Sequence, residues 1–258
     1  MKIIKAIIVA FSMYSRIPMP QFAWKDEDMK YMLCFFPWVG AVIGACLYGW
    51  YALSSQIGID ALGYTLVGMV IPLLITGGFH VDGYMDTMDA FHSYQPKERK
   101  LEILKDSHIG AFSVISLVIY GLIYGAAFSE IRDVKAIAVV SAGFVLARCL
   151  SGIGVVTFLG AKKEGLLFMF ASKAQKTIVK GALYIQGVLC IAVMILLSPV
   201  AGCVAVLTAL GTLWYYYRKT KKELGGITGD TSGWFVLLCE GAMVVSVAVA
   251  EMITLFHK

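Results

Sequence analysis

The sequence predicts an all-α fold, a polytopic integral membrane helix bundle with about seven transmembrane helices and an N-terminal interfacial or re-entrant helix. Two observations lead to this prediction. The first is composition: 59% of the 258 residues are hydrophobic and 15% are charged, whereas a soluble domain has about 45–50% apolar and about 25% charged residues. The second is distribution, because seven apolar windows contain only four of the 39 charged residues. An ordinary soluble enzyme, a disordered chain and a disulfide scaffold are therefore excluded.

Each apolar window is long enough to form a membrane-spanning helix. The windows are 32–54, 61–79, 109–128, 136–160, 177–197, 200–217 and 233–256. About 20 apolar residues cross a hydrocarbon core of ~30 Å, and helices satisfy the backbone hydrogen bonds that lipid cannot. A β-barrel would show shorter segments of alternating polarity instead. Since no repeat or low-complexity tract divides the chain, we expect residues 1–258 to form a single membrane-embedded domain.

The basic residues predict the orientation of the bundle. Seven spans place residues 1–31, 80–108, 161–176 and 218–232 on one side, which carries 18 lysines and arginines when Lys180 is included. The other side carries three, namely Arg132, Lys135 and Lys258. Basic loops stay in the cytoplasm, so the long loops are expected to face the cytoplasm from the cytoplasmic (inner) membrane. The net charge of +5 then reflects topology, and we expect no nucleic-acid partner.

The first residues and the cysteines carry weaker signals. Residues 1–14 are apolar but lack a small-residue cleavage site of a signal peptide. An interfacial or re-entrant helix is favoured over an eighth span, because a crossing would place Lys2 and Lys5 outside. All six cysteines lie in apolar windows without a C-x-x-C pair, which argues against disulfides and a thiolate zinc site.

The most informative segment is 76–89, which contains three aspartates at spacing i, i+4, i+7. On a helix this spacing places Asp82, Asp86 and Asp89 on one face. Carboxylate oxygens are the ligands that Mg²⁺ prefers. The alternative is a solvated acidic face at a helix end. We favour the metal site, because the aspartates directly follow an apolar span and the break at Gly77 and Gly78.

A second glycine-rich segment, 225–233, leads into the last span. Asp230 or Thr231 is placed to cap the following helix, and the free N–H groups of a helix N-terminus bind phosphate. Taken alone, this segment is typical of a turn followed by a helix cap. The predicted topology places it on the same side of the membrane as Asp82, which favours a role in the same site. The candidate positions for backbone contacts to a bound cofactor or phosphate are Gly77, Gly78, Gly226, Thr228 and Gly229.

Three further ionisable residues are candidates. Arg148 and Glu240 lie deep in apolar windows, where charge is costly and marks a cavity, a partner or a site. Arg148 is suited to a phosphate or a carboxylate, and Glu240 is a candidate metal ligand. The alternative for each is a pair with a neighbour inside the bundle, and we favour the functional role. Lys105 lies where the chain re-enters the membrane and is suited to balance phosphate charge.

These motifs resemble the cobalamin synthase family, the adenosylcobinamide-GDP ribazoletransferases. The resemblance rests on T-G-G-x-H-x-D-G-x-x-D-T-x-D at 76–89, L-E-I-L-K-D-S-x-I-G-A-F at 101–112 and G-G-x-T-G-D-T at 225–231, with weaker support at 16–18 and 36–40. The chain departs from the family at two positions. His108 stands where the family has a basic residue, usually arginine, and Trp234 replaces a small residue.

The resemblance implies a magnesium-dependent transferase. A ribose hydroxyl of α-ribazole, or of its 5'-phosphate, would attack the cobinamide phosphate of adenosylcobinamide-GDP, and GMP would leave. Mg²⁺ would be held by Asp82, Asp86, Asp89, Asp230 and Glu240. Arg148 or Lys105 would balance charge, and His80 is the candidate base, with a metal-bound carboxylate as the alternative.

The resemblance also implies the partners. They are the corrinoid nucleotide, α-ribazole and the lipid bilayer, with a homo-oligomer or a complex with other cobamide-assembly enzymes left open. Two other functions are alternatives to this transferase, a CDP-alcohol phosphotransferase and an ion-coupled transporter. A CDP-alcohol phosphotransferase shares an Asp-Gly start but continues with Ala-Arg, which this chain lacks after Gly83. An ion-coupled transporter would place its acidic residues near the bilayer midplane.

Overall fold

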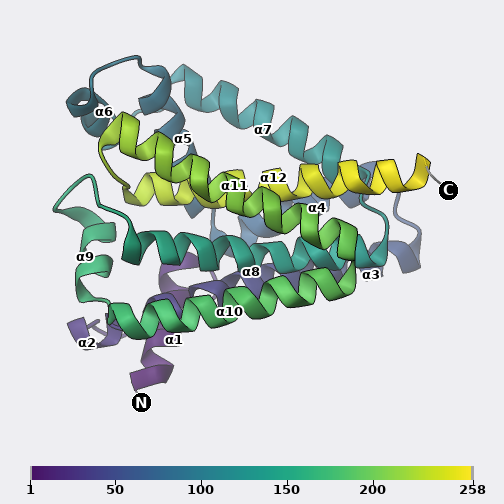
Figure 1. The fold of residues 1–258 in the computed structure, drawn as a ribbon, viewed down its shortest axis with the longest axis horizontal. Helices are drawn as coiled ribbons and strands as arrows, with labels where there is room; N and C mark the ends of the chain where they lie inside the picture. Colours follow the sequence, from purple (N-terminus) through teal and green to yellow (C-terminus); the bar gives the residue numbers. More distant parts are fainter. Residues whose placement is uncertain (1, 257–258) are drawn as a thin grey trace.

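The computed structural model describes residues 2–256, and these residues form helices joined by short connections (Figure 1). The α-helices, in chain order, are α1 Lys2–Tyr14, α2 Asp26–Met29, α3 Phe36–Ile57, α4 Ala61–Thr76, α5 Phe79–His92, α6 Lys97–Ile103, α7 Ala111–Ser129, α8 Val134–Thr157, α9 Gly165–Lys173, α10 Lys176–Leu197, α11 Pro199–Leu224 and α12 Gly229–Phe256. A 3-10 turn over Met32–Phe35 leads into α3. The described residues contain no strand, only an isolated bridge between Gly160 and Ile227.

The helices confirm the predicted membrane architecture. Six helices of the described chain are long and apolar enough to span a membrane, and a seventh span results when α4 and α5, bent by 95°, are counted as one. Every predicted window coincides with one of these helices, although α4 ends at Thr76 and not at residue 79. The N-terminal helix α1 has 13 residues and is not among the candidate spans.

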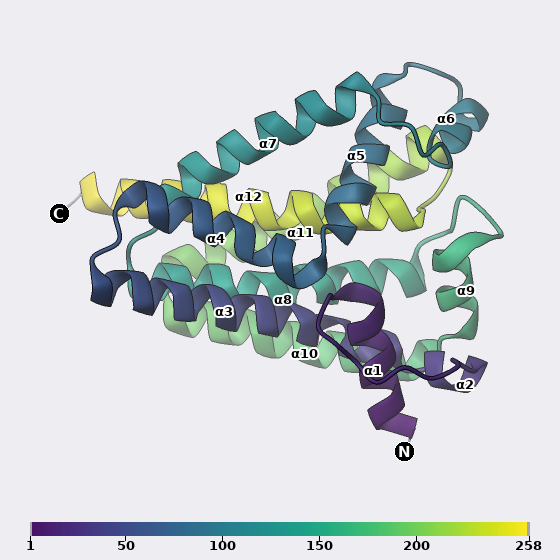
Figure 2. The ribbon, with the colours of Figure 1, turned by 180° about the vertical axis from the view of Figure 1, so that it is seen from behind.

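Helix α8 is the centre of the bundle, with α3, α10 and α12 packed around it (Figures 1 and 2). Of its most apolar window 78% is buried, against 22% for the peripheral helix α7. Gly40 and Gly44 of α3 lie so close to α8 that a Cβ on either would overlap the backbone of Phe144 or Ser141. Small residues at such crossings allow helices to approach closely where water provides no driving force.

The outer helices present large apolar side chains to their surroundings. Four examples are Leu122, Ile185, Leu196 and Leu207, which are between 64% and 83% exposed. A soluble protein rarely exposes contiguous apolar surface of this extent. The outer surface is therefore lipid-facing, and the protein is a multi-pass membrane protein.

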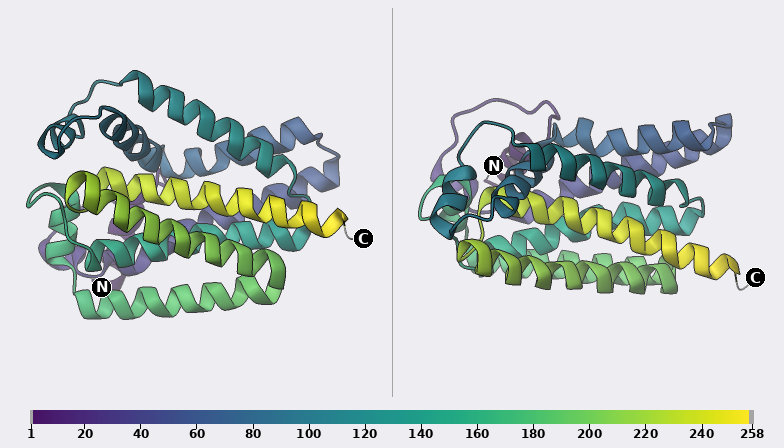
Figure 3. Two further views of the ribbon diagram at one scale, coloured as in Figure 1. Left: turned by 45° about the horizontal axis from the view of Figure 1, so that its top comes forward. Right: turned by 90° about the horizontal axis from the view of Figure 1, so that it is seen from above.

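The long connections gather at one end of the bundle (Figure 3). Helices α5, α6 and α9 lie there, whereas α12 ends at the opposite end (Figures 1 and 2). All four segments of the predicted basic side therefore share one end; Lys258 of the other side lies outside the described residues. We take α4 as the membrane-spanning part of this bent pair, because α5 turns by 95° from it and runs across this end of the bundle (Figure 2).

Candidate functional site

The break at Gly77 and Gly78 turns the chain from α4 into α5. Both residues have positive φ, 67° and 80°, a region that glycine enters without a steric penalty. Gly77 also lies against Arg16, since a Cβ there would be 2.5 Å from the arginine Cγ. The Arg16 amide in turn donates to Ile75 O at 2.7 Å. The two glycines, predicted to contact a cofactor or phosphate, therefore have an evident role in the backbone turn.

Helix α5 carries the three predicted aspartates on one face. Asp82 is exposed, whereas Asp86 and Asp89 are half-buried. Burial and the nearby negative charges of Asp82, Asp230 and Asp89 raise the pKa of Asp86 to about 6. Burial is the larger cause, and the crowding of like charge adds to it; a bound cation relieves this crowding.

Asp89 is already engaged by the backbone of another helix. Its two carboxylate oxygens accept hydrogen bonds from the amides of Gly110, at 2.7 Å, and Ser113, at 2.9 Å. These amides belong to the start of α7, where the first N–H groups lack partners within the helix. Asp89, predicted as a metal ligand, thus joins α5 to α7, and the structure gives it a structural role.

The second glycine-rich segment is fixed to the loop after α8. The amide of Ile227 donates to Leu159 O at 2.9 Å, and the amide of Ala161 donates to Ile227 O at 2.8 Å. Gly226 lies against the same backbone, where a Cβ would overlap Leu159 O. Gly226 therefore has a packing role between the two loops, and its predicted contact to a ligand stays a prediction.

The cap of α12 differs from the prediction that Asp230 or Thr231 fills this role. Thr228 is the capping residue, because its hydroxyl accepts from the Thr231 amide at 3.2 Å. In return, the Thr231 hydroxyl accepts from the Thr228 amide at 2.8 Å. This reciprocal pair is a capping box in which threonine takes the place of glutamate. Asp230 is thereby free of a capping role.

Helices α5 and α12 cross at two glycines, and this crossing brings the two acidic segments together. A Cβ at Gly83 would lie 2.7 Å from Asp230 O, and one at Gly233 would lie 3.3 Å from His80 Cα. Asp82 and Asp230 consequently line one cleft with an empty volume of about 910 Å³. Its polar lining residues are Asp82, Lys162, Glu164, Thr228 and Asp230.

Lys162 and Glu164 are the cleft residues that sequence reasoning missed as site residues. Lys162 is half-buried, and desolvation lowers its pKa although the nearby Asp230 charge raises it. Glu164 forms an ion pair with Lys105, Nζ to Oε1 2.5 Å, at the exposed rim. The predicted residue Lys105 therefore lies beside the cleft and not inside it. The signal in the sequence was the charged run at 162–164 after an apolar span.

Arg148 and Glu240 pair with each other. Arg148 Nη1 lies 2.5 Å from Glu240 Oε1 and 2.9 Å from Phe144 O, and both side chains are buried. Glu240 also lines a separate cavity between α4, α7 and α12. Neither residue lines the cleft of the aspartates. The ion pair is the alternative stated above for both residues, and the roles of Glu240 as a metal ligand and Arg148 as a phosphate ligand stay predictions.

His80 lies beside the aspartate cleft but faces a different cavity. Its ring contacts Tyr14, Phe36 and Phe79, with centroid distances of 6.4, 5.8 and 5.7 Å. Its Nε2 atom is buried without a hydrogen-bond partner. The candidate general base is thus held in an aromatic environment next to the acidic residues.

Comparison with known proteins identifies the family. The family model described as cobalamin-5-phosphate synthase matches residues 6–248. The chain belongs to this family. Among its relatives, the adenosylcobinamide-GDP ribazoletransferase of Lachnoclostridium phytofermentans is 42% identical over 99% of this chain and 98% of the relative. Proteins of the same name from Clostridium perfringens, 31% identical over 92% and 94%, and Listeria monocytogenes, 33% identical over 89% and 91%, are also similar. No solved structure matches the chain significantly.

The family assignment confirms the resemblance stated from the motifs and sets aside the two other functions. Within the described residues of this cobalamin-5-phosphate synthase family member, no group of three or more His, Cys, Asp or Glu side chains is already arranged around a metal position. The donor set nevertheless fits Mg²⁺, which commonly uses one or two carboxylates and completes its shell with water and phosphate oxygens. Asp82 and Asp230 line the cleft, and the negative charge of Asp86 on α5 interacts with both.

Proposed function

We propose that this protein is an adenosylcobinamide-GDP ribazoletransferase that depends on magnesium and works from the cytoplasmic face of the inner membrane. The observation that carries the proposal is the shared cleft of Asp82 and Asp230, with Lys162 in its wall. The carboxylates of Asp82 and Asp230 and the ammonium group of Lys162, which line the same cleft, suit a substrate that carries a diphosphate. The basic residues at the same end support a cytoplasmic orientation.

We assign a separate role in phosphoryl transfer to each charged residue in and around the cleft. Asp82, Asp86 and Asp230 would hold Mg²⁺, which neutralises charge on the diphosphate when bound. Lys162 orients the phosphate oxygens, and Lys105 at the rim attracts the anionic donor. Such reactions need positioning and charge balance more than covalent help from the protein.

The reaction forms one P–O bond and breaks another. The ribose hydroxyl of the acceptor attacks the phosphorus attached to cobinamide, and the bond to the GMP oxygen breaks with its electron pair leaving on GMP. A carboxylate oxygen of Asp82, exposed in the cleft, accepts the hydroxyl proton. We assign this step to the cleft because His80 faces the neighbouring aromatic cavity.

The test is GMP release by membranes that contain the protein, supplied with adenosylcobinamide-GDP, α-ribazole and Mg²⁺. Asp82→Asn and Asp230→Asn should each lower turnover by a factor of at least ~100, as loss of a charge-stabilising group does. The matched control is Asp60→Asn, at the cap of α4 on the opposite end, where asparagine also caps a helix. Absence of GMP release by the wild type, or full activity of both cleft variants, would contradict the proposal.

A further inference from the structure

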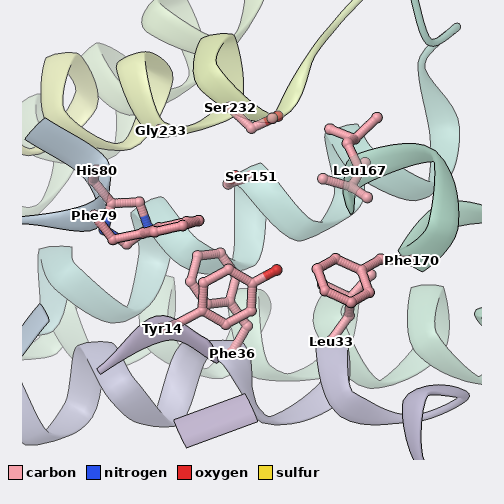
Figure 4. A pocket seen from close by; sticks show the side chains of 12 residues that line it. Tyr14, Leu33, Phe36, Phe79, His80, Ser151, Leu167, Phe170, Ser232 and Gly233 are labelled. Atoms are coloured by element: carbon pink, nitrogen blue, oxygen red, sulfur yellow. The ribbon is translucent and has the colours of Figure 1, made fainter. Parts of the chain in front are cut away.

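A second cavity lies directly beside the aspartate cleft and has a different chemical character (Figure 4). It has an empty volume of about 480 Å³, which includes space that is open to solvent. Its walls come from α1, α3, α5, α8, α9 and α12. Aromatic rings form much of its lining, namely those of Tyr14, Phe36, Phe79, His80 and Phe170.

The aromatic rings of the lining contact one another in stacked and edge-on arrangements. Tyr14 and His80 are parallel to within 5°, and Phe79 stands edge-on to the His80 ring at 80°. Figure 4 shows the Tyr14, His80 and Phe170 side chains directed into the same space from three helices. Offset-stacked and edge-to-face arrangements are those in which aromatic rings attract one another. The cavity therefore favours a planar aromatic group.

A fully buried polar atom of the lining, His80 Nε2, has no hydrogen-bond partner among the described residues. His80 is 5% exposed, and its buried Nε2 forms no hydrogen bond in the described chain. Leaving such an atom unpaired costs about 1–3 kcal/mol, and a buried unpaired group calls for an explanation. A ligand with a single acceptor nitrogen would satisfy it.

The cavity and the aspartate cleft share three lining residues, Phe79, Leu167 and Gly229. A ligand with a flat, weakly polar end in the cavity thus extends a second, polar end toward Asp82 and Asp230. A nucleoside has this shape, with its base at one end and its ribose hydroxyls at the other.

We propose that this aromatic cavity binds the base of the acceptor nucleoside, a planar and weakly polar bicycle of the benzimidazole type. His80 Nε2–H donates to the ring nitrogen that is not attached to the sugar. This places the ribose hydroxyl at the cleft, so His80 is a binding residue for the acceptor. The inference rests on the proposed function, because it assumes that an acceptor nucleoside reacts at the aspartates.

The donor substrate fits this cavity poorly. Guanine carries a carbonyl, an amino group and ring N–H donors, whereas the polar side chains of the lining are limited to Tyr14, His80, Ser151 and Ser232. Each unmatched polar group costs about 1–3 kcal/mol when buried. A corrin macrocycle is too large for a space of about 480 Å³. The cavity is therefore assigned to the acceptor.

The first experiment separates the two substrates by steady-state kinetics. Phe170→Ala removes a ring from the wall, and Ser151→Leu fills the cavity from α8. Phe170→Ala should raise the KM for α-ribazole up to ~10-fold, on the scale of one lost aromatic contact. Ser151→Leu should raise it further, because the larger side chain occupies the space of the base. Both variants should change the KM for adenosylcobinamide-GDP less than twofold. His80→Phe should raise the acceptor KM with little change in kcat. A kcat loss without a KM change would instead make His80 the general base and overturn the assignment.

The second experiment does not depend on turnover. Free benzimidazole is titrated into the purified, lipid-embedded protein by calorimetry, with adenine as the polar comparison. Wild type should bind benzimidazole at least ~10-fold more tightly than adenine, and Ser151→Leu should abolish binding. The control Val188→Phe adds bulk on the lipid-facing side of α10 and should bind normally. Equal binding of both bases, or unchanged binding by Ser151→Leu, would overturn the proposal.

Together, the two experiments distinguish a failure of the proposed function from a failure of the proposed base site. If the wild type releases no GMP but binds benzimidazole through this cavity, the proposed function fails and the base site stands. If GMP is released while acceptor KM and benzimidazole binding are insensitive to the cavity variants, the function stands and the base site is wrong.

Discussion

Gly83 of α5 lies directly against the backbone of Asp230 at the start of α12. A Cβ at position 83 would be 2.7 Å from Asp230 O and 3.0 Å from its Cα. This contact sets the separation between the two acidic segments. The distance between Asp82 and Asp230 thus depends on the absence of a side chain at the position between them.

We predict that Gly83→Ala pushes α5 away from α12 and inactivates the protein. A displacement of about 1 Å at reacting groups costs on the order of 100-fold in rate, so GMP release should fall by about this factor while the protein still inserts. The matched control is Gly181→Ala in α10, where a Cβ meets nothing within 4 Å. That variant should keep full activity. Normal turnover by Gly83→Ala would show that the helix crossing does not set the site.

Asp86 provides a test of the metal that does not rely on activity. Without Mg²⁺, Asp86→Asn removes one of the crowded negative charges, so its melting temperature should rise by about 2–4 °C for each kcal/mol of repulsion relieved. With Mg²⁺, the wild type should gain stability and the variant should not. Glu98→Gln, an exposed residue of α6, is the control and should leave the Mg²⁺ response intact. A Mg²⁺-induced shift of equal size in Asp86→Asn would rule Asp86 out as a ligand.

The ion pair between Arg148 and Glu240 predicts a loss of stability without a change in metal dependence. Glu240→Gln leaves the buried arginine charge without its partner, which costs about 3–5 kcal/mol. The Mg²⁺ concentration for half-maximal activity should stay the same. A double variant, Arg148→Met with Glu240→Leu, should recover much of the stability. If Glu240→Gln instead raised the Mg²⁺ requirement at unchanged stability, the original prediction of a metal ligand would hold.

The proposed orientation predicts a labelling pattern. In a chain whose native cysteines are replaced, cysteines at Tyr94 and Lys163 should react with a membrane-impermeant maleimide only after the cells are opened. A cysteine at Arg132, at the other end of the bundle, should react in intact cells. These three positions are exposed, so accessibility is set by the membrane. The reverse pattern would place the cleft outside the cytoplasm, and labelling of Tyr94 and Lys163 from different sides would contradict the single site.

Sequence reasoning succeeded where a regular period or a composition contrast carries the information. The span windows follow from apolar composition, and the shared face of Asp82 and Asp86 follows from helical spacing. It could not choose partners, because partner choice depends on packing. The pairing of Arg148 with Glu240 joins positions 92 residues apart, and the amides that engage Asp89 belong to a helix whose placement no local pattern reveals.

The prediction of the capping residue of α12 was wrong for a different reason. Thr228 and Thr231 stand three residues apart, which is the spacing of a capping box, so the signal was in the sequence. Asp230 lies between the two threonines and is also a common capping residue, so the sequence alone did not favour Thr228. The structure shows the threonines holding the backbone, which leaves the aspartate carboxylate available to the cleft.

The paired backbone hydrogen bonds between the loops after α8 and after α11 have a mechanical consequence. They tie the segment that carries Lys162 to the segment that carries Asp230 through Ala161 and Ile227. The separation between the cation and the anion of the cleft is therefore set by backbone hydrogen bonds between these two loops and does not depend on side-chain packing.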